Sequence, residues 1–372
     1  MIRLDPLNRR RLRNFRANRR AYWSTIVFAV LFAVCLVAEI VGNDRPLLLS
    51  FRGEIMAPAF TGRNYEEREF GGDPGFVARF IDPVVQCLIV AGGLEACFDT
   101  PEETLADAHD GVVAGAEIEQ GWMIWPPIRW SFRTIDEDIG QPAPSPPDAR
   151  HWLGTDDQAR DVLARVIYGF RISVVFALIV TVCSSIVGIA AGAVQGYFGG
   201  WLDLLFQRLI EIWQATPPLY VIIIMGAIFS MSFPLLTFLI VLFSWTALVG
   251  VVRAEFLRGR NFEYVRAARA LGVSDGKIMF RHVLPNAMVA TVTLLPFLVT
   301  AAVATLTGLD FLGFGLPPSY PSLGELALQG KNNLQSPHLA ITAFISIALL
   351  LSLLVFIFEG VRDAFDPRKT FR

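Results

Sequence analysis

Few residues in this chain combine the types and the spacing that chemistry requires. A phosphate-cradling loop reads G-x-x-x-x-G-K-[ST], and the pairs Gly276-Lys277 and Gly330-Lys331 both lack the upstream glycine. The histidines have no metal-ligand spacing; they are His109, His151, His282 and His338. We therefore expect a chain that is not an enzyme and that holds no nucleotide, cofactor or metal of its own.

The four cysteines divide by their surroundings. Cys35 and Cys183 lie in long apolar runs, where a free cysteine acts as a small apolar residue. Cys87 and Cys97 are the only pair in an acidic segment, and Gly92-Gly93 between them is flexible enough to bring the two sulfurs together. We expect a disulfide between them if the segment faces an oxidising compartment. Two free, buried thiols are the alternative.

Small residues recur every four positions in one apolar run. A helix places such residues on one face, where they allow a second helix to approach closely; they are Ser184, Gly188, Gly192 and Gly196. Pro217-Pro218 and Pro296 lie in other apolar runs and can kink the helices there. We interpret all of these as packing features rather than substrate contacts.

The polar segment 262–286 is the most informative part of the sequence. It begins with a run of good helix formers that ends at Gly272, where a missing Cβ permits a left-handed turn. A second short helix follows, and Pro285 opens the next apolar run. Ala267 and Ala268 leave little side chain, so another protein could approach this helix closely. An ordinary helical hairpin is the alternative.

The residues above lie in or between long apolar runs, and these runs predict a membrane protein. The chain has 372 residues, of which 53% are hydrophobic and 18% charged, against about 25% charged in soluble domains. The charges stand in blocks between uncharged runs, which excludes a cytosolic enzyme, a disordered chain and a small disulfide-rich protein. Since about 20 residues cross a bilayer, we predict six spans: 22–41, 172–194, two within 212–252 divided at 230–234, 287–309 and 339–358.

Basic residues near the span ends predict the orientation. Residues 1–20 hold eight arginines and one acid, and residues 253–286 hold seven basic residues and three acids. Residues 42–165 hold 22 acids and 10 arginines. We expect both termini in the cytoplasm and a periplasmic domain between the first two spans. The first apolar run exceeds the about 7–15 residues of a signal peptide, which favours an uncleaved anchor.

Three smaller features bear on function. Charges lie only near span ends, whereas a proton- or sodium-coupled carrier usually keeps one at mid-membrane; this favours another energy source. The N-terminal arginines have helical spacing, which fits a helix on an anionic leaflet or a topology signal alone. Trp122, Trp125 and Trp130 flank Pro126-Pro127 and lie either at a membrane interface or in a small core. A helix is also expected within 101–120.

The segment 262–286 resembles the signature loop of binding-protein-dependent ABC importer permeases. It reads Ala-Ala-x-x-x-Gly with Leu-Pro twelve positions after the glycine. Arg266 replaces the family's usual acid and His282 a common isoleucine, as in the dipeptide and oligopeptide branch. Residues 152–169 and 310–325 also resemble that branch. The stretches 4–8 and 18–24 are similar to Yej-type peptide and microcin C permeases, of the second (E) subunit kind.

The resemblance implies an all-α membrane protein with the six helices of the type I, MetI-like permease fold. It divides the chain into a basic segment 1–21, a first helix 22–41, a periplasmic domain 42–168 with an apparent insertion at 82–120, a permease core 169–360 and a cytoplasmic tail 361–372. The residues that the resemblance assigns to the ATPase-coupling loop are Glu263, Tyr264, Arg266, Ala267, Ala268, Gly272, Leu284 and Pro285.

The function implied is a permease subunit of an ATP-driven peptide importer in the bacterial inner membrane. Its implied partners are a second homologous permease, ABC ATPase subunits that carry ATP and Mg²⁺, a periplasmic substrate-binding protein, a peptide substrate and membrane lipid, with no nucleic acid. A stand-alone secondary carrier or channel is the alternative, and a membrane-anchored sensor or scaffold is a third possibility. An ATPase partner would support only the first.

Overall fold

A computed structural model describes residues 6–109, 112–113, 116–117 and 119–365. The chain divides into two units. The helical unit consists of residues up to 32, 169–332 and 340 onward, and the mixed unit consists of 33–168 and 333–339. The helices that lie wholly or mostly in the helical unit are α1 (Pro6–Ala17), α2 (Arg19–Leu36), α8 (Val162–Phe198), α9 (Gly200–Ala215), α10 (Pro218–Ile228), α11 (Phe233–Ser244), α12 (Thr246–Gly259), α13 (Glu263–Ala270), α14 (Asp275–Ile278), a π-turn (Met279–Val283), α15 (Leu284–Val292), α16 (Leu295–Phe311), α17 (Leu323–Asn332) and α18 (Pro337–Phe365).

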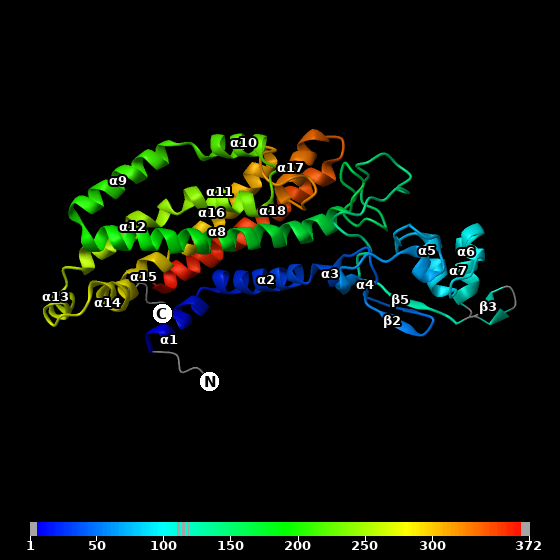
Figure 1. Ribbon diagram of the computed structural model, residues 1–372, viewed down its shortest axis with the longest axis horizontal. Helices are drawn as coiled ribbons and strands as arrows, with labels where there is room; N and C mark the ends of the chain where they lie inside the picture. The colour runs from blue at the N-terminus through cyan, green and yellow to red at the C-terminus, as the bar shows by residue number, and fades with distance from the viewer. Residues whose placement is uncertain (1–5, 110–111, 114–115, 118, 366–372) are drawn as a thin grey trace. The chain divides into compact units, whose positions relative to one another are not determined.

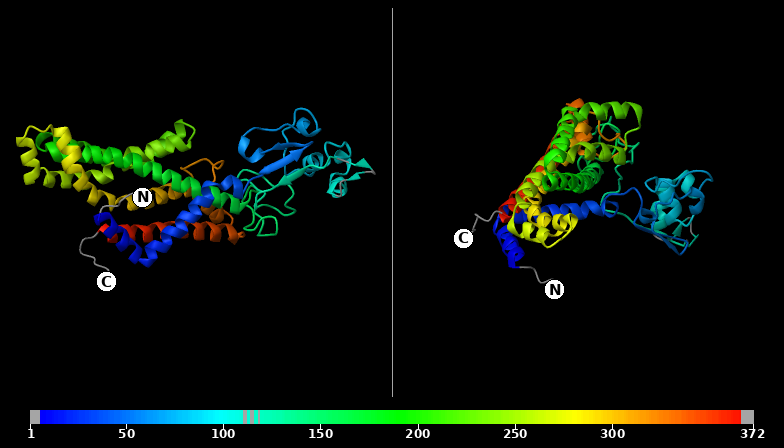
Figure 2. Two further views of the ribbon diagram at one scale, coloured as in Figure 1. Left: turned by 90° about the horizontal axis from the view of Figure 1, so that it is seen from below. Right: turned by 60° about the vertical axis from the view of Figure 1, so that its left-hand side comes forward.

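The long helices of this unit run in the same general direction, with α13 and α14 at one end and α17 at the other (Figures 1 and 2). Four helices are long and apolar enough to cross a membrane: α2, α8, α18 and the pair α11–α12. Two further spans result if each bent pair counts as one, namely α9 with α10 and 275–292 with α16. The predicted number of six is reached in this way, and the predicted division at 230–234 falls between α10 and α11.

Both bent pairs break beside prolines. The angle is 65° between α9 and α10, where Pro217 precedes Pro218, and 51° ahead of α16, where Pro296 is the second residue. A proline lacks the N–H that continues a helix and clashes with the preceding turn. The third span differs from the prediction, because α9 begins at Gly200 and carries charged residues. One of them, Asp203, is buried in an ion pair with Arg253 of α12, at 2.6 and 2.7 Å.

The small residues of α8 lie against α12. A Cβ added at Gly188 would meet the carbonyl oxygen of Trp245, one at Gly192 would lie 2.7 Å from that of Val249, and one at Gly196 would meet that of Arg253. Ser184 is buried and donates its hydroxyl to the carbonyl of Val180 within α8. The three glycines therefore allow backbone-to-backbone packing that no larger residue permits. We call this contact the glycine seam.

The mixed unit contains short strands that were not predicted for an all-α chain. Its elements are α3 (Ala38–Val41), β1 (Leu48–Phe51), β2 (Glu54–Met56), α4 (Pro58–Thr61), a 3-10 turn (Glu67–Phe70), α5 (Pro83–Val90), α6 (Ala96–Asp99), α7 (Pro101–His109), β3 (Val112–Val113), β4 (Ala116–Glu117) and β5 (Trp122–Ile124). The antiparallel sheet has the order β2-β1-β5, and β3 pairs with β4. Arg52 and Gly53, both at positive φ, make the tight turn between β1 and β2. The strands are too short for a clear alternating pattern.

The segment predicted as an insertion forms part of the core of this unit. Cys87, Leu88 and Ile89 of α5 are fully buried and cluster with Leu49 of β1 and with Phe70. The predicted helix within 101–120 ends at His109, and the described residues that follow it form β3 and β4. Residues 82–109 therefore belong to the fold of the mixed unit instead of forming an appendage.

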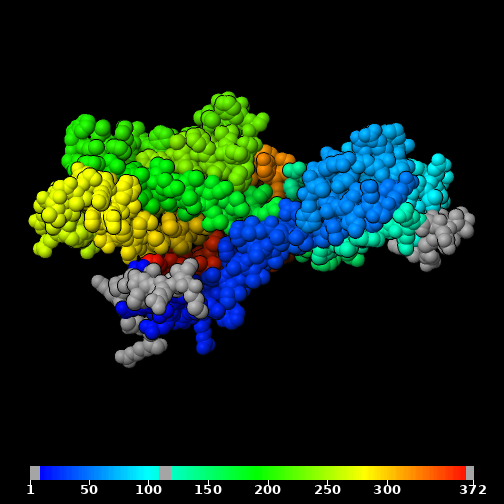
Figure 3. Space-filling view, turned by 60° about the horizontal axis from the view of Figure 1, so that its bottom comes forward, coloured from blue at the N-terminus to red at the C-terminus, as the bar shows by residue number. Residues whose placement is uncertain are grey.

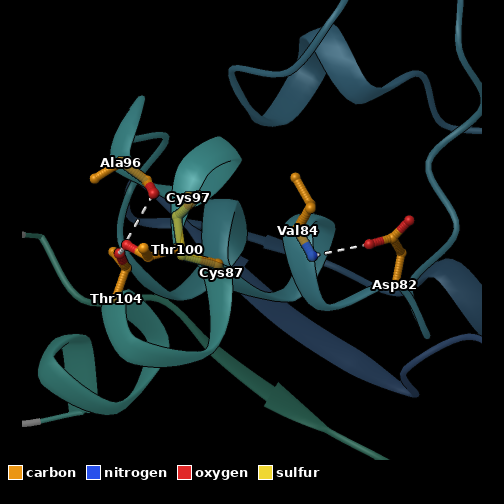
Figure 4. The surroundings of a disulfide bond; sticks show 7 residues. All are labelled: Asp82, Val84, Cys87, Ala96, Cys97, Thr100 and Thr104. Carbon is orange, nitrogen blue, oxygen red and sulfur yellow. Dashed lines mark hydrogen bonds between the residues drawn. A yellow bond between two sulfur atoms is a disulfide. The ribbon is translucent and has the colours of Figure 1, made fainter.

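The structure joins Cys87 of α5 to Cys97 of α6 in a disulfide, with the two Cα atoms 5.6 Å apart (Figure 4). Gly92 and Gly93 both adopt positive φ in the intervening turn, which lets the chain reverse between the two helices. The other two cysteines, Cys35 and Cys183, form no disulfide among the described residues.

Removing this disulfide by a Cys87→Ala/Cys97→Ala double substitution is expected to destabilise the mixed unit by about 2–3 kcal/mol, because the unfolded chain gains entropy. Uptake should change little. Alkylation of the unreduced protein followed by mass spectrometry should label Cys183, which is exposed, and leave the two bonded cysteines unmodified. Label on both Cys87 and Cys97 of native protein would contradict the assignment.

A buried histidine in the mixed unit lies between two carboxylates. The ring of His151 is 1% exposed, and its nitrogens lie 2.9 Å from Asp161 Oδ2 and 3.1 Å from Asp136 Oδ2. Trp130 packs on the ring, and Arg150 lies 3.0 Å from the same Asp136 oxygen. Burial alone would lower the pKa of His151, but the hydrogen bonds and charges of the two aspartates raise it above its ordinary value.

The stability of the chain is therefore expected to fall as pH rises from about 6.5, the ordinary histidine value, through the raised folded pKa. The folded state holds this proton more tightly than the unfolded state, so the stabilisation is complete at low pH and disappears above the folded pKa. Thermal unfolding of the full chain should show this decline, and His151→Gln should flatten it. A decline of equal slope in the variant would contradict the assignment.

Candidate functional site

The α13 helix is amphipathic, with one face in a core and the other in solvent. Val265 is fully buried and Ala268 is 9% exposed, in a cluster that includes Phe256 of α12 and Ile278 of α14. The exposed face consists of Glu263, Tyr264, Arg266, Ala267, Arg269, Ala270 and Leu271. Ala268 therefore packs in the core of this protein, and of the two alanines expected to allow close approach only Ala267 lies on the exposed face.

The end of α13 is a complete Schellman motif. Gly272 has a φ of +79°, its N–H donates to the carbonyl of Arg269 at 3.0 Å, and the N–H of Val273 donates to that of Ala268 at 3.1 Å. An added Cβ at Gly272 would meet no atom within 4 Å. Glycine is thus required here by the backbone conformation and not by crowding.

A polar network ties the end of α13 to the end of α8. The hydroxyl of Tyr197 donates to Asp275 at the start of α14, and Arg269 donates to that hydroxyl at 3.0 Å. Arg260 donates to the backbone carbonyl of Tyr197 at 3.2 Å. These four residues line one cavity of about 550 Å³ beside Gly272. Any displacement of α13 therefore acts on the same turn of α8 that follows the glycine seam.

The start of α13 is tied to the next span instead. The amide of Asn286 in α15 donates to the hydroxyl of Tyr264 at 2.9 Å and to the carbonyl of His282 at 3.3 Å. Leu284 begins α15 with Pro285 as its second residue. Because Pro285 cannot donate to the preceding turn, the helix widens into the π-turn at Met279–Val283.

The opposite end of the helical unit is closed around a buried carboxylate. Asp310, 3% exposed at the end of α16, accepts hydrogen bonds from the N–H of Leu316 at 2.7 Å and from the hydroxyl of Ser322. A Cβ at Gly315 would collide with that carboxylate, and one at Gly324 would meet the carbonyl of Thr307. The motif at 310–325 therefore fixes how the chain turns from α16 into α17.

Across the part of the chain that the structure describes, no group of three or more His, Cys, Asp or Glu residues could hold a metal ion. The residues from Glu263 to Gly272 that were predicted to form a coupling loop lie on or beside α13, which projects at one end of the unit (yellow, Figure 3). Leu284 and Pro285 lie behind it at the start of α15.

Sequence reasoning missed the residues that hold α13. Tyr197, Arg260 and Asp275 are far apart in the chain and match no short motif, so only the fold brings them together. The one available signal was Asp275 in the first turn of the second helix, since an acid there favours a helix start.

Comparison with known proteins gives consistent results. The family described as "Binding-protein-dependent transport system inner membrane component" matches residues 184–371, which contain α13 and most of the helical unit. The chain is 50% identical to the peptidoglycan transport system permease protein YejE of Agrobacterium fabrum, over 99% of this chain and 95% of that one. It is also 50% identical to the inner membrane ABC transporter permease protein YejE of Escherichia coli, over 99% of both. The dipeptide transport system permease protein DppC of Bacillus subtilis is 31% identical over 60% of this chain and 70% of that one.

Proposed function

Because the chain belongs to the family of binding-protein-dependent transport system inner membrane components, we propose that it is the permease subunit of an ATP-driven importer of peptides or peptide-like compounds. The observation that carries this proposal is the 50% sequence identity to two permease proteins over nearly the full length of the chain. The names of the relatives, which mention peptidoglycan and dipeptide transport, support the choice of substrate class.

In this proposal α13 is the coupling helix. Its exposed face, with Ala267 and Leu271, docks on an ABC ATPase that binds ATP and Mg²⁺ on the cytoplasmic side of the bacterial inner membrane. ATPase closure pushes α13, and its two tethers pass the movement to α8 through Tyr197 and to α15 through Tyr264. A second homologous permease completes the cavity through which substrate crosses the membrane, and a periplasmic binding protein delivers the substrate.

A stand-alone carrier or channel is the competing function. It would need an ionisable residue or a pore within this chain alone, whereas two charges inside spans, Asp203 and Arg253, are paired with each other. The exposed face of α13 also has no role in a carrier that works without a cytoplasmic partner.

The purified chain alone is expected neither to bind nor to hydrolyse ATP, since no loop in its sequence can cradle phosphate. Nucleotide binding is measured by equilibrium dialysis on the chain in detergent. Uptake of a labelled peptide by reconstituted vesicles should appear only when the ATPase, the second permease and the binding protein are added. Saturable nucleotide binding, or uptake by this chain alone, would overturn the proposed function.

A further inference from the structure

The tryptophans beside Pro126-Pro127 line a set of adjoining cavities within the mixed unit. The first, of about 400 Å³, is lined by residues that include Trp125, Arg129, Trp130 and Trp152. A second, of about 450 Å³, shares Trp130 and Arg150 with it, and a third, of about 370 Å³, shares Trp125 and Arg129. We call these three cavities together the tryptophan groove.

Arginines lie on the tryptophan rings in this groove. The guanidinium of Arg129 lies 5.3 Å from the ring centre of Trp125, and that of Arg150 lies 5.3 Å from the ring centre of Trp130. Trp152 is 60% exposed, so its indole offers an open apolar face. The part of the groove around Arg129 therefore combines flat apolar surface with positive charge, whereas most acids of the groove line the second cavity.

One of these charges has no partner. Arg150 is paired with Asp136, but Arg129 forms no hydrogen bond or ion pair with any residue that the structure describes. An arginine stacked on a ring keeps its N–H edge free to bind a carboxylate in two-point fashion.

We propose that the tryptophan groove binds a small peptide-like compound through its carboxylate, which pairs with Arg129, while an apolar or sugar face of the ligand lies on the indoles. The choice of a peptide rests on the proposed function, whereas the groove itself does not. The site would hold substrate on this chain, outside the spans, in addition to any site in the cavity between permeases.

A free compound fits this surface better than a lipid headgroup. Arg129 has no ion pair among the described residues, and it lies on a unit with more than twice as many acids as arginines. The two cavities that Arg129 lines hold one acid, Asp161, so a small ligand there avoids most of the acids that an anionic bilayer would face. Polar groups that fix the orientation of a ligand, with apolar walls around them, are typical of small-molecule sites.

The test uses the full chain in nanodiscs of zwitterionic lipid. The probe is the tripeptide Ala-Ala-Phe as its free acid, compared with its C-terminal amide by calorimetry. The variant is Arg129→Ala. The matched control is Arg133→Ala, since Arg133 is likewise stacked on a ring, that of Phe132, and likewise has no ion pair among the described residues, but it lines none of the three cavities.

The free acid is expected to bind roughly ten times more tightly than the amide, as a charge-assisted pair predicts. Arg129→Ala should abolish that difference, and Arg133→Ala should preserve it. Equal binding of acid and amide by the unchanged chain would overturn the site. Equal losses of binding in both variants would also overturn it. So would a result in which Arg129→Ala weakens binding to anionic-lipid vesicles, measured in parallel, but does not weaken binding of the peptide.

The outcome is separable from that of the proposed function. Peptide uptake by the reconstituted transporter, measured in parallel, tests the transport role. If uptake continues while the unchanged chain shows no carboxylate-dependent binding, the proposed site in the groove is rejected and the proposed permease function stands. If the chain binds the carboxylate but no uptake occurs under any condition, the permease function is rejected and the site stands.

Discussion

Gly272→Val is expected to reduce peptide uptake to background while the chain still accumulates in the membrane. The left-handed conformation costs an ordinary residue about 1–2 kcal/mol, and a β-branched residue is a stronger outlier still. The Schellman hydrogen bonds at Arg269 and Ala268 then cannot form together, and α13 loses the orientation of its exposed face. Uptake and substrate-stimulated ATP hydrolysis in reconstituted vesicles measure the effect.

Gly276→Val is the matched control. Gly276 lies four residues further on, has equally open space around its Cβ position and has no positive φ. It should keep most of the uptake. The coupling role of α13 would be refuted if Gly272→Val supported uptake and coupled ATP hydrolysis at the level of the unchanged protein.

Gly196→Ala is expected to destabilise the folded chain strongly. The new methyl group would meet the Arg253 carbonyl oxygen and lie 2.6 Å from the Phe256 Cβ, and neither can move without shifting α12. Overpacking of this kind costs about 1–3 kcal/mol in well-packed cores. The yield of folded chain and its thermal unfolding temperature should both fall, and assembly with partner subunits should be lost.

Gly250→Ala tests whether the effect comes from contact rather than from changing any glycine. Gly250 is on α12, and a Cβ there would meet no atom within 4 Å. Alanine is the better helix former by up to about 1 kcal/mol, so this variant should be as stable as the unchanged chain or more so. If both substitutions lowered the unfolding temperature equally, the glycine seam would not explain the loss.

The spans could be predicted because the bilayer imposes one strong rule, a run of about 20 apolar residues. That rule placed α18 and the division between α10 and α11 well. It failed at α9, because Arg208 and Glu211 exclude these residues from an uncharged run in the sequence, whereas in the structure α9 runs through them and Arg253 neutralises Asp203. The small strands were not predicted for another reason. Strands such as β1 and β2 form because they pair with each other, and their own sequences are too short to show an alternating hydrophobic pattern.

The candidate site was predictable where its chemistry is local. The φ of Gly272 follows from its place after a helix, and the spacing of Gly188, Gly192 and Gly196 follows from the helical repeat. The burial of Ala268 could not be foreseen, because the sequence does not say which face of α13 meets α12. The contact between Tyr197 and Arg269 depends on two distant segments meeting.

The glycine seam also determines where the helical unit can bend. Backbone packed on backbone leaves no side chains to rearrange, so α8 and α12 must travel together as one rigid body. Flexing is then left to places where the helical hydrogen-bond ladder is already interrupted, as it is ahead of Pro218 and Pro296. Those two breaks would be the hinges of an alternating-access movement. The two prolines determine where along the chain they lie.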